Sequence, residues 1–116
     1  TRGGLATVLN EWAMQSRLGI EVEQARVPVH ESVQAACELL GLDPLYIANE
    51  GKLVAAVAPG AATTALSALR AHPLGERAEI IGRVTEVHPG RVLLQTPFGA
   101  ARALDMLAGE QLPRIC

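Results

Sequence analysis

The sequence has 116 residues, of which 49% are hydrophobic, and its 10 Lys and Arg residues against 12 Asp and Glu residues give a formal net charge of −2. This length suits one ordinary domain, and the lack of a basic stretch argues against binding to nucleic-acid phosphates. No secretory leader and no run of about 18 apolar residues is visible, so we expect a cytoplasmic protein that does not bind a membrane.

The first predicted element is a helix that starts near Leu5 and ends before Gly19. Its apolar residues recur at helical spacing: Leu5, Val8, Leu9, Trp12 and Ala13. We expect Thr1 to cap this helix, with Gly3 and Gly4 exposing backbone N–H groups at its positive end. Such a helix start binds anions, although a glycine-rich turn without a ligand is an equally good interpretation.

A strand over residues 20–24 and an extended connector at 27–29 lead to a second predicted helix. This helix covers residues 31–40 and is closed by Gly41. Its predicted apolar face consists of Val33, Ala36, Cys37 and Leu40. We therefore expect Cys37 to be a buried structural thiol.

Two short apolar runs, at residues 45–48 and 53–58, predict a pair of strands joined by the polar turn Asn49-Glu50-Gly51-Lys52. Taken alone, these polar residues indicate a solvated hairpin tip. A third helix is predicted from Ala62 to about Leu69, and the β-type run at 78–87 is expected to form a hairpin with 92–95. A last short strand near Arg102 precedes a tail without periodicity.

The predicted order of elements favours an α/β or α+β sandwich, in which helices cover the faces of a mixed sheet. The three histidines are isolated and no pair has metal-ligand spacing, so we predict no metal site. Cys116 is the last residue, which gives its thiol the reach of a chain end. The alternative is a frayed terminus without a role.

Three motifs, found at the start, middle and end of the chain, make it resemble the HypE family of hydrogenase maturation factors. They are Thr1-Arg2-Gly3-Gly4, Ala48-Asn49-Glu50-Gly51-Lys52 and Leu112-Pro113-Arg114-Ile115-Cys116. The resemblance implies the wider superfamily of aminoimidazole ribonucleotide synthetase (PurM) and selenophosphate synthetase. It implies a PurM-like C-terminal domain at 1–108, a flexible tail at 109–116, and an N-terminal ATP-binding domain outside this chain.

The resemblance also implies an activity. Cys116 would accept a carbamoyl group from the carbamoyltransferase HypF, and ATP-dependent dehydration would convert that group to a thiocyanate. The cyano group would then pass to iron on the HypC–HypD complex, for the nickel–iron hydrogenase centre. The full-length protein would be a homodimeric carbamoyl dehydratase, whereas this chain alone would be inactive.

Each motif would have a part in this activity. Glu50 would be the catalytic base, and Lys52 would keep it ionised or help to bind charge. Thr1, Gly3 and Gly4 would lie near the ATP phosphates, with magnesium held mainly by the absent domain. The alternatives are another PurM-like ATP-dependent synthetase domain, and a non-enzymatic module that a partner recognises through its C-terminal peptide.

Overall fold

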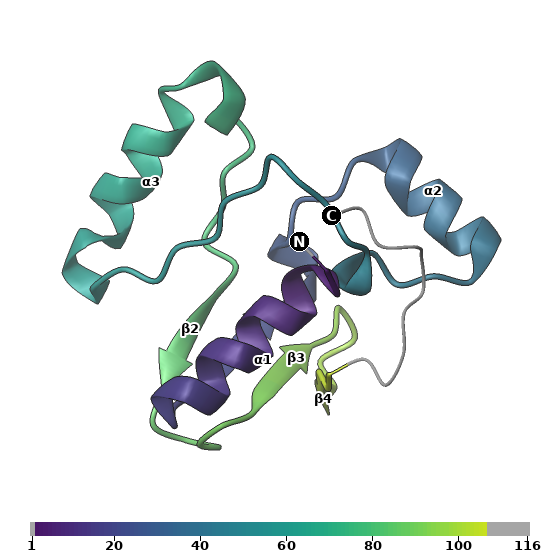
Figure 1. The fold of residues 1–116 in the computed structure, drawn as a ribbon. Helices are drawn as coiled ribbons and strands as arrows, with labels where there is room; N and C mark the ends of the chain where they lie inside the picture. The colour runs from purple at the N-terminus through teal and green to yellow at the C-terminus, as the bar shows by residue number, and fades with distance from the viewer. Residues whose placement is uncertain (1, 107–116) are drawn as a thin grey trace.

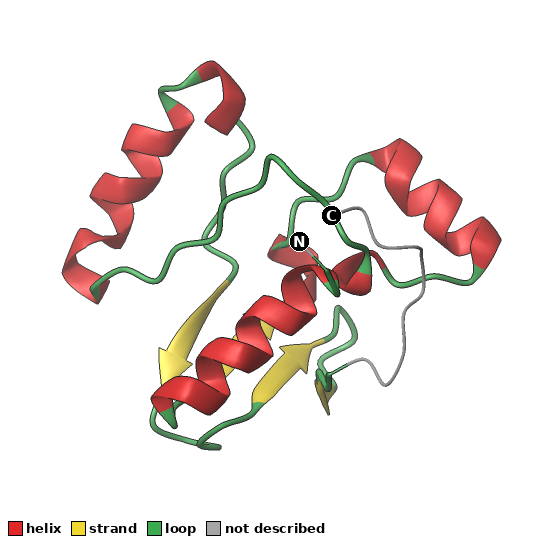
Figure 2. Ribbon diagram, viewed as in Figure 1, coloured by secondary structure: helices red, strands yellow, loops and turns green. Residues whose placement is uncertain are grey.

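The computed structural model describes residues 2–106, which form three helices and a four-stranded sheet (Figures 1 and 2). The helices are α1 (Gly4–Ser16), α2 (Glu31–Leu40) and α3 (Ala62–Arg70), and the strands are β1 (Gly19–Glu23), β2 (Gly82–Thr85), β3 (Val92–Gln95) and β4 (Ala101–Ala103). A short 3₁₀ turn, η2 (Pro44–Tyr46), lies between α2 and α3 in the chain. The three predicted helices, the first strand and the short last strand are confirmed.

The sheet has the strand order β2-β1-β3-β4 and is mixed. Strand β1 pairs antiparallel with β2 and parallel with β3, whose other edge pairs antiparallel with β4. Helix α1 lies along this sheet (Figure 1). Helices α2 and α3 lie on opposite sides of the view, and the segment that connects them runs between the two. The predicted α/β class with a mixed sheet is therefore confirmed.

The predicted hairpin between β2 and β3 is wrong, because β1 lies between these two strands. The connection at residues 86–91 crosses the beginning of β1, where the N–H of Gly90 donates to the Leu18 carbonyl at 2.9 Å. The Val87 carbonyl lies so close to Gly19 that a side chain there would collide with it. We expected Gly19 only to end the first helix. Its lack of a side chain lets residues 86–91 cross β1, so that β2 and β3 lie on opposite sides of β1.

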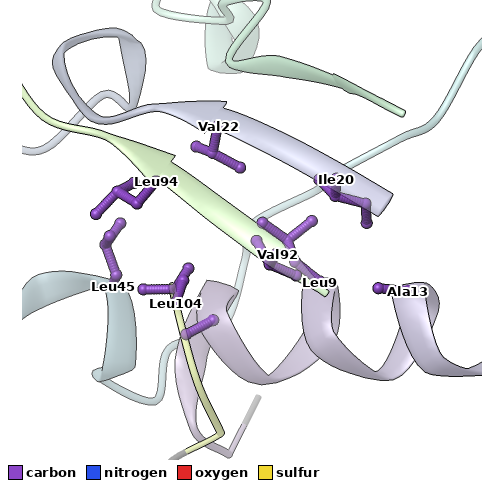
Figure 3. Close-up of a cluster of buried hydrophobic side chains, with 9 residues drawn as sticks. Leu9, Ala13, Ile20, Val22, Leu45, Val92, Leu94 and Leu104 are labelled. Atoms are coloured by element: carbon purple, nitrogen blue, oxygen red, sulfur yellow. The ribbon is translucent and has the colours of Figure 1, made fainter. Parts of the chain in front are cut away.

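The hydrophobic core lies between α1 and the adjacent strands β1 and β3 (Figure 3). Ile20 lies beside Val92 and Val22 beside Leu94 in the parallel register, so their side chains form two adjacent rows on one face. Residues from α1, η2 and the chain after β4 close this core: Ala6, Leu9, Ala13, Leu45 and Leu104. Alternating burial along β1 and β3 is the pattern expected for a sheet with one covered face.

The buried face of α1 is rotated from the predicted one. Its buried residues are Gly4, Ala6, Leu9, Asn10 and Ala13, whereas Leu5 and Trp12 pack only partly against the core. The small side chains of Ala6 and Ala13 let the helix approach the sheet closely. Asn10 is buried because its amide nitrogen donates to the carbonyls of Ala6, at 2.8 Å, and Leu104, at 2.7 Å.

The predicted strands at 45–48 and 53–58 are wrong. Asp43 accepts a hydrogen bond from the Leu45 N–H at 2.9 Å, and Pro44 supplies a fixed backbone angle, so the first segment forms the 3₁₀ turn η2 instead. Residues 53–58 are assigned to no strand of the described sheet. Of the run at 78–87, only β2 joins the sheet.

The predicted apolar face of α2 is only partly buried. Cys37 is 5% exposed, which confirms the prediction of a buried thiol, but Val33 is 41% and Leu40 is 68% exposed. Helix α3 has no buried residue. Among residues 2–106, no helix combines the length and the apolar character needed to cross a membrane.

Candidate functional site

The start of α1 is glycine-rich and has no side-chain cap among the described residues. The capping residue is Gly3, in the left-handed conformation with φ 71°, and within residues 2–106 no side chain caps the helix. The first turn carries no acidic residue. Because the first N–H groups of a helix have no partner within it, this start offers donors without a competing carboxylate. The expected cap, Thr1, lies outside the described residues, and the capping position belongs to Gly3.

Gly4 brings this helix start against η2. A Cβ atom at Gly4 would lie 2.6 Å from the carbonyl oxygens of both Leu45 and Ile47, and the residue has a positive φ of 63°. Both features require glycine. The chain therefore leaves η2 and enters the Asn49–Lys52 turn from a position that directly contacts the first residue of α1.

The polar turn after η2 is an exposed loop rather than a hairpin tip. The Asn49 amide nitrogen donates to the Ile47 carbonyl at 3.0 Å, the same carbonyl that lies against Gly4. Gly51 has a φ of 71°, which turns the chain sharply. Glu50 and Lys52 are both exposed, and within residues 2–106 they do not form an ion pair with each other.

The sequence-predicted site residues are thus brought together only in part. Gly3 and Gly4 lie next to the segment that leads into Glu50, although about 45 residues separate them in sequence. This pairing puts the start of α1 and the exposed Glu50 carboxylate on adjoining segments of the chain. Cys116 lies outside the described residues.

Metal binding finds no support in the described part of the chain. Over residues 2–106, no three His, Cys, Asp or Glu side chains gather closely enough to hold a metal ion. His30 contacts Arg77, and His72 accepts a hydrogen bond from the Leu74 N–H at 3.1 Å. These described residues do not fit a magnesium site, and we derive no step through the metal.

Two further residues, missed by the sequence reasoning, hold the chain that follows β4. Tyr46, the last residue of η2, donates its hydroxyl to the Asp105 carbonyl at 2.6 Å, and Asn10 holds the neighbouring Leu104 carbonyl. Burial, and then the Asp43 carboxylate, raises the pKa of the Tyr46 hydroxyl above its ordinary value. A lone tyrosine after an Asp-Pro turn is the only sequence signal for this contact.

The chain matches known proteins over its whole length. The family model of the AIR synthase related protein, C-terminal domain, matches residues 1–95. Carbamoyl dehydratase HypE of Cupriavidus necator is 57% identical over 116 residues, which are 100% of this chain and 33% of that protein. Carbamoyl dehydratase HypE of Bradyrhizobium diazoefficiens is 58% identical over the same residues, 34% of its length. The chain thus spans about a third of the length of these relatives.

Solved structures agree. A crystal structure of hydrogenase maturation protein HypE in complex with ATP matches with a TM-score of 0.92 and 51% identity, covering 100% of this chain and 36% of that one. A HypE–HypF complex matches with a TM-score of 0.87 and 42% identity, covering 92% of this chain and 34% of that one. Another HypE crystal structure gives a TM-score of 0.93 at 52% identity, over 100% of this chain and 38% of that one.

Proposed function

The chain belongs to the AIR synthase related protein family, whose C-terminal domain it represents, and we propose that it is the acceptor-bearing domain of a HypE-type carbamoyl dehydratase. In this proposal Cys116 accepts a carbamoyl group, and the full-length protein dehydrates that group with ATP to a thiocyanate. The product supplies the cyanide ligand of a nickel–iron hydrogenase centre. The observation that supports this most is the contact of Gly4 with Ile47, which brings the open helix start beside the segment leading to Glu50.

The start of α1 fits the phosphates of ATP. It has no acidic residue in its first turn and no side-chain cap among the described residues, and a helix start of this kind favours an anion. In the proposal Gly3 and Gly4, with Thr1, hold the nucleotide through backbone donors, and Lys52 adds positive charge nearby. A solved HypE is bound to ATP, which supports the assignment. In the proposal magnesium accompanies the nucleotide, held mainly by the N-terminal domain of the full-length protein.

Bound ATP supplies the phosphoryl group that turns the carboxamide oxygen into a leaving group. Glu50 then takes a proton from the carboxamide nitrogen as the C–O bond breaks, and the nitrogen electrons complete a C≡N bond on the Cys116 sulfur. Two N–H protons and one oxygen leave in all, which equals the loss of one water. A base positioned at such a proton contributes about 100- to 10,000-fold to the rate.

The proposed reaction requires partner proteins that donate the carbamoyl group and accept the cyano group. A solved HypE is in complex with HypF, which supports HypF as the carbamoyl donor. We propose HypC–HypD as the acceptor of the cyano group and a homodimer for the full-length protein. We assign the reaction to the cytoplasm, because thiols stay reduced there.

The test uses the full-length protein with HypF, carbamoyl phosphate and ATP, followed by intact-mass analysis of the terminal peptide. We expect the gain of one carboxamide and then the loss of one water. Cys116→Ser should abolish both changes, whereas Cys37→Ala, at the buried thiol, should keep both. If modification persists in Cys116→Ser, the proposed carrier is wrong. If HypF binding survives in Cys116→Ser but the wild type is never modified, the chain is a docking module instead.

The role of Glu50 has its own test. Glu50→Gln removes the proton acceptor but keeps the size and polarity of the side chain, so carbamoylated protein should accumulate without losing water. Glu76→Gln is the matched control, since Glu76 is also an exposed glutamate but follows α3 rather than η2. Equal dehydration rates in Glu50→Gln and the wild type would exclude Glu50 as the base.

A further inference from the structure

We propose that a groove beside α2 is a docking site for a basic segment of HypF. The groove has a volume of about 410 Å³, and its lining residues come from η1 (Gln24–Arg26), the connector at 27–29, α2 and η2. This volume is in the range of about 300 to 1,000 Å³ that is typical of ligand sites. The inference rests on the proposed function, because it takes HypF as the partner.

Part of the groove is apolar. Val27 and Val29 line it from the connector, and Leu45, which is 4% exposed, lines it from η2. Leu45 belongs to the hydrophobic core and Val27 packs against that core, so the core holds this part of the lining in place. A chain segment laid here therefore buries apolar side chains against a preformed surface.

Another part of the lining is acidic. Glu31, Gln34, Ala35 and Glu38 all line the groove, and their spacing of i, i+3, i+4 and i+7 puts them on one face of α2. Asp43 adds a third carboxylate from the residue that precedes η2. The groove thus combines apolar side chains with three carboxylates.

Two of these carboxylates lack a cationic partner. Asp43 forms an ion pair with Arg102 at 3.5 Å. In the part of the chain that the structure describes, neither Glu31 nor Glu38 forms an ion pair. Glu38 lies in the last turn of α2, which carries no basic residue, and the helix dipole disfavours a negative charge there. A cation supplied by a partner is therefore attracted both by the Glu38 carboxylate and by this helix end.

Basic residues of the neighbouring segments are engaged with other groups. Arg26 forms an ion pair with Glu23 at 2.9 Å. Arg77 contacts His30 and donates to the Val29 carbonyl at 3.4 Å. Both arginines lie outside the lining of the groove, so the groove keeps a net negative charge.

This lining fits a segment that carries both basic and apolar side chains. Glu31 and Glu38 are seven residues apart, which is about 10 Å along a helix, so about three residues of an extended segment span them. The solved HypE–HypF complex matches 92% of this chain, so a domain of this kind is present in that complex. We therefore assign the groove to HypF rather than to HypC–HypD.

The first experiment removes negative charge from the groove of the full-length protein. The double variant Glu31→Gln, Glu38→Gln should bind HypF with a Kd raised about two- to thirtyfold at low salt, the range expected for two exposed ion pairs. Its Kd should also depend less on salt than that of the wild type, mainly through slower association, which a general loss of structure would not produce.

The matched control removes two exposed glutamates from elsewhere. Glu11 lies on α1 and Glu86 follows β2, and neither lines the groove. The double variant Glu11→Gln, Glu86→Gln should bind HypF with the wild-type Kd and salt dependence. Equal Kd values and equal salt dependence in the groove variant and the wild type would overturn the inference.

A second variant fills the groove and keeps its charges. Ala35→Trp puts a large side chain at an exposed position of the lining, whereas Ala36→Trp puts the same side chain at the next exposed position of α2, outside the lining. We expect weaker HypF binding in Ala35→Trp alone. Equal affinity of the two variants for HypF would reject the groove as the docking site.

The third experiment identifies the occupant. With Ala35 replaced by photoreactive benzoylphenylalanine, we expect a cross-link to a HypF segment that contains Lys or Arg. Cross-links only to HypC–HypD, to a second copy of the protein, or to a HypF segment without a basic residue would contradict the proposal. Groove variants should still reach full carbamoylation at saturating HypF. A wild type that cross-links to HypF as expected but is never carbamoylated would refute the proposed function alone.

Discussion

Tyr46 is the single tyrosine of the chain, so its ionisation can be followed without interference from other phenols. Burial raises the pKa of its hydroxyl first, Asp43 and Asp105 raise it further, and Arg102 acts in the opposite direction. The hydroxyl donates to the Asp105 carbonyl only while it is protonated. The contact is therefore complete at neutral pH and is lost in alkaline solution.

The pH dependence follows from the sign of this shift. A tyrosine whose pKa is higher in the folded than in the unfolded chain stabilises the fold below the unfolded value, about 10, and this contribution disappears as pH rises through the folded value. We expect an ultraviolet absorbance titration of folded protein to have a midpoint above that of the same protein in denaturant. Coincident midpoints would contradict the upward shift of the Tyr46 pKa in the folded chain.

At the scale of elements, the contact between α1 and η2 unites two segments that carry the predicted site. It depends on Gly4, where both a positive φ and two nearby carbonyl oxygens exclude a side chain. Gly41, after α2, has a similar positive φ of 69° but nothing within 4 Å of a Cβ atom. Substituting alanine at each glycine therefore distinguishes two contributions to the free energy of unfolding. Gly41 reports the positive φ alone, and Gly4 reports the positive φ together with the close approach to η2.

We expect Gly41→Ala to lower the free energy of unfolding by about 1 kcal/mol, the cost of a left-handed alanine. Gly4→Ala should cost about 2 to 4 kcal/mol, because η2 must also move away from the helix start. Urea denaturation of both variants measures the difference. The rate of dehydration by the full-length protein should fall only in Gly4→Ala. Equal losses in the free energy of unfolding for the two variants would show that the close approach of Gly4 to η2 does not affect stability.

On the scale of the whole molecule, several large apolar side chains are exposed. Exposed apolar side chains lie on β2, on residues 53–58, on α3 and on the turn that follows α3: Val84, Leu53, Val57, Leu69 and Leu74. Exposed apolar side chains are candidates for contact with other chain segments or partners where they form a contiguous patch. The relatives are about three times as long as this chain, so they have further residues that can make such contacts.

We expect residues 1–116 alone neither to bind ATP tightly nor to hydrolyse it. The described residues contribute a helix start and two exposed charged side chains, but no cluster of three metal-binding residues. Calorimetric titration with ATP and a phosphate-release assay, each run beside the full-length protein, measure both properties. Turnover by the short chain at the rate of the long one would contradict the division of the site between domains.

The sequence alone determined the helices, the α/β class and the family. Helical periodicity and Gly41 define α2 to the residue, and buried Cys37 follows from its spacing. The resemblance to HypE is confirmed over the full chain by relatives at 57% and 58% identity. Local signals suffice here because helix ends and family motifs each depend on residues that are contiguous in the sequence. The domain limits at 1–108 and 109–116, and the roles of Cys116 and Glu50, stay predictions.

Only the tertiary structure decided how these pieces meet. The order β2-β1-β3-β4, the passage of residues 86–91 across Gly19, and the contact of Gly4 with Ile47 all join residues that are far apart in sequence. The strand prediction at 45–48 failed because the Asp43 side chain competed with the sheet for the Leu45 N–H. Such outcomes depend on which hydrogen-bond partner reaches a given backbone group in the folded chain. The spacing of apolar residues does not predict which partner that is.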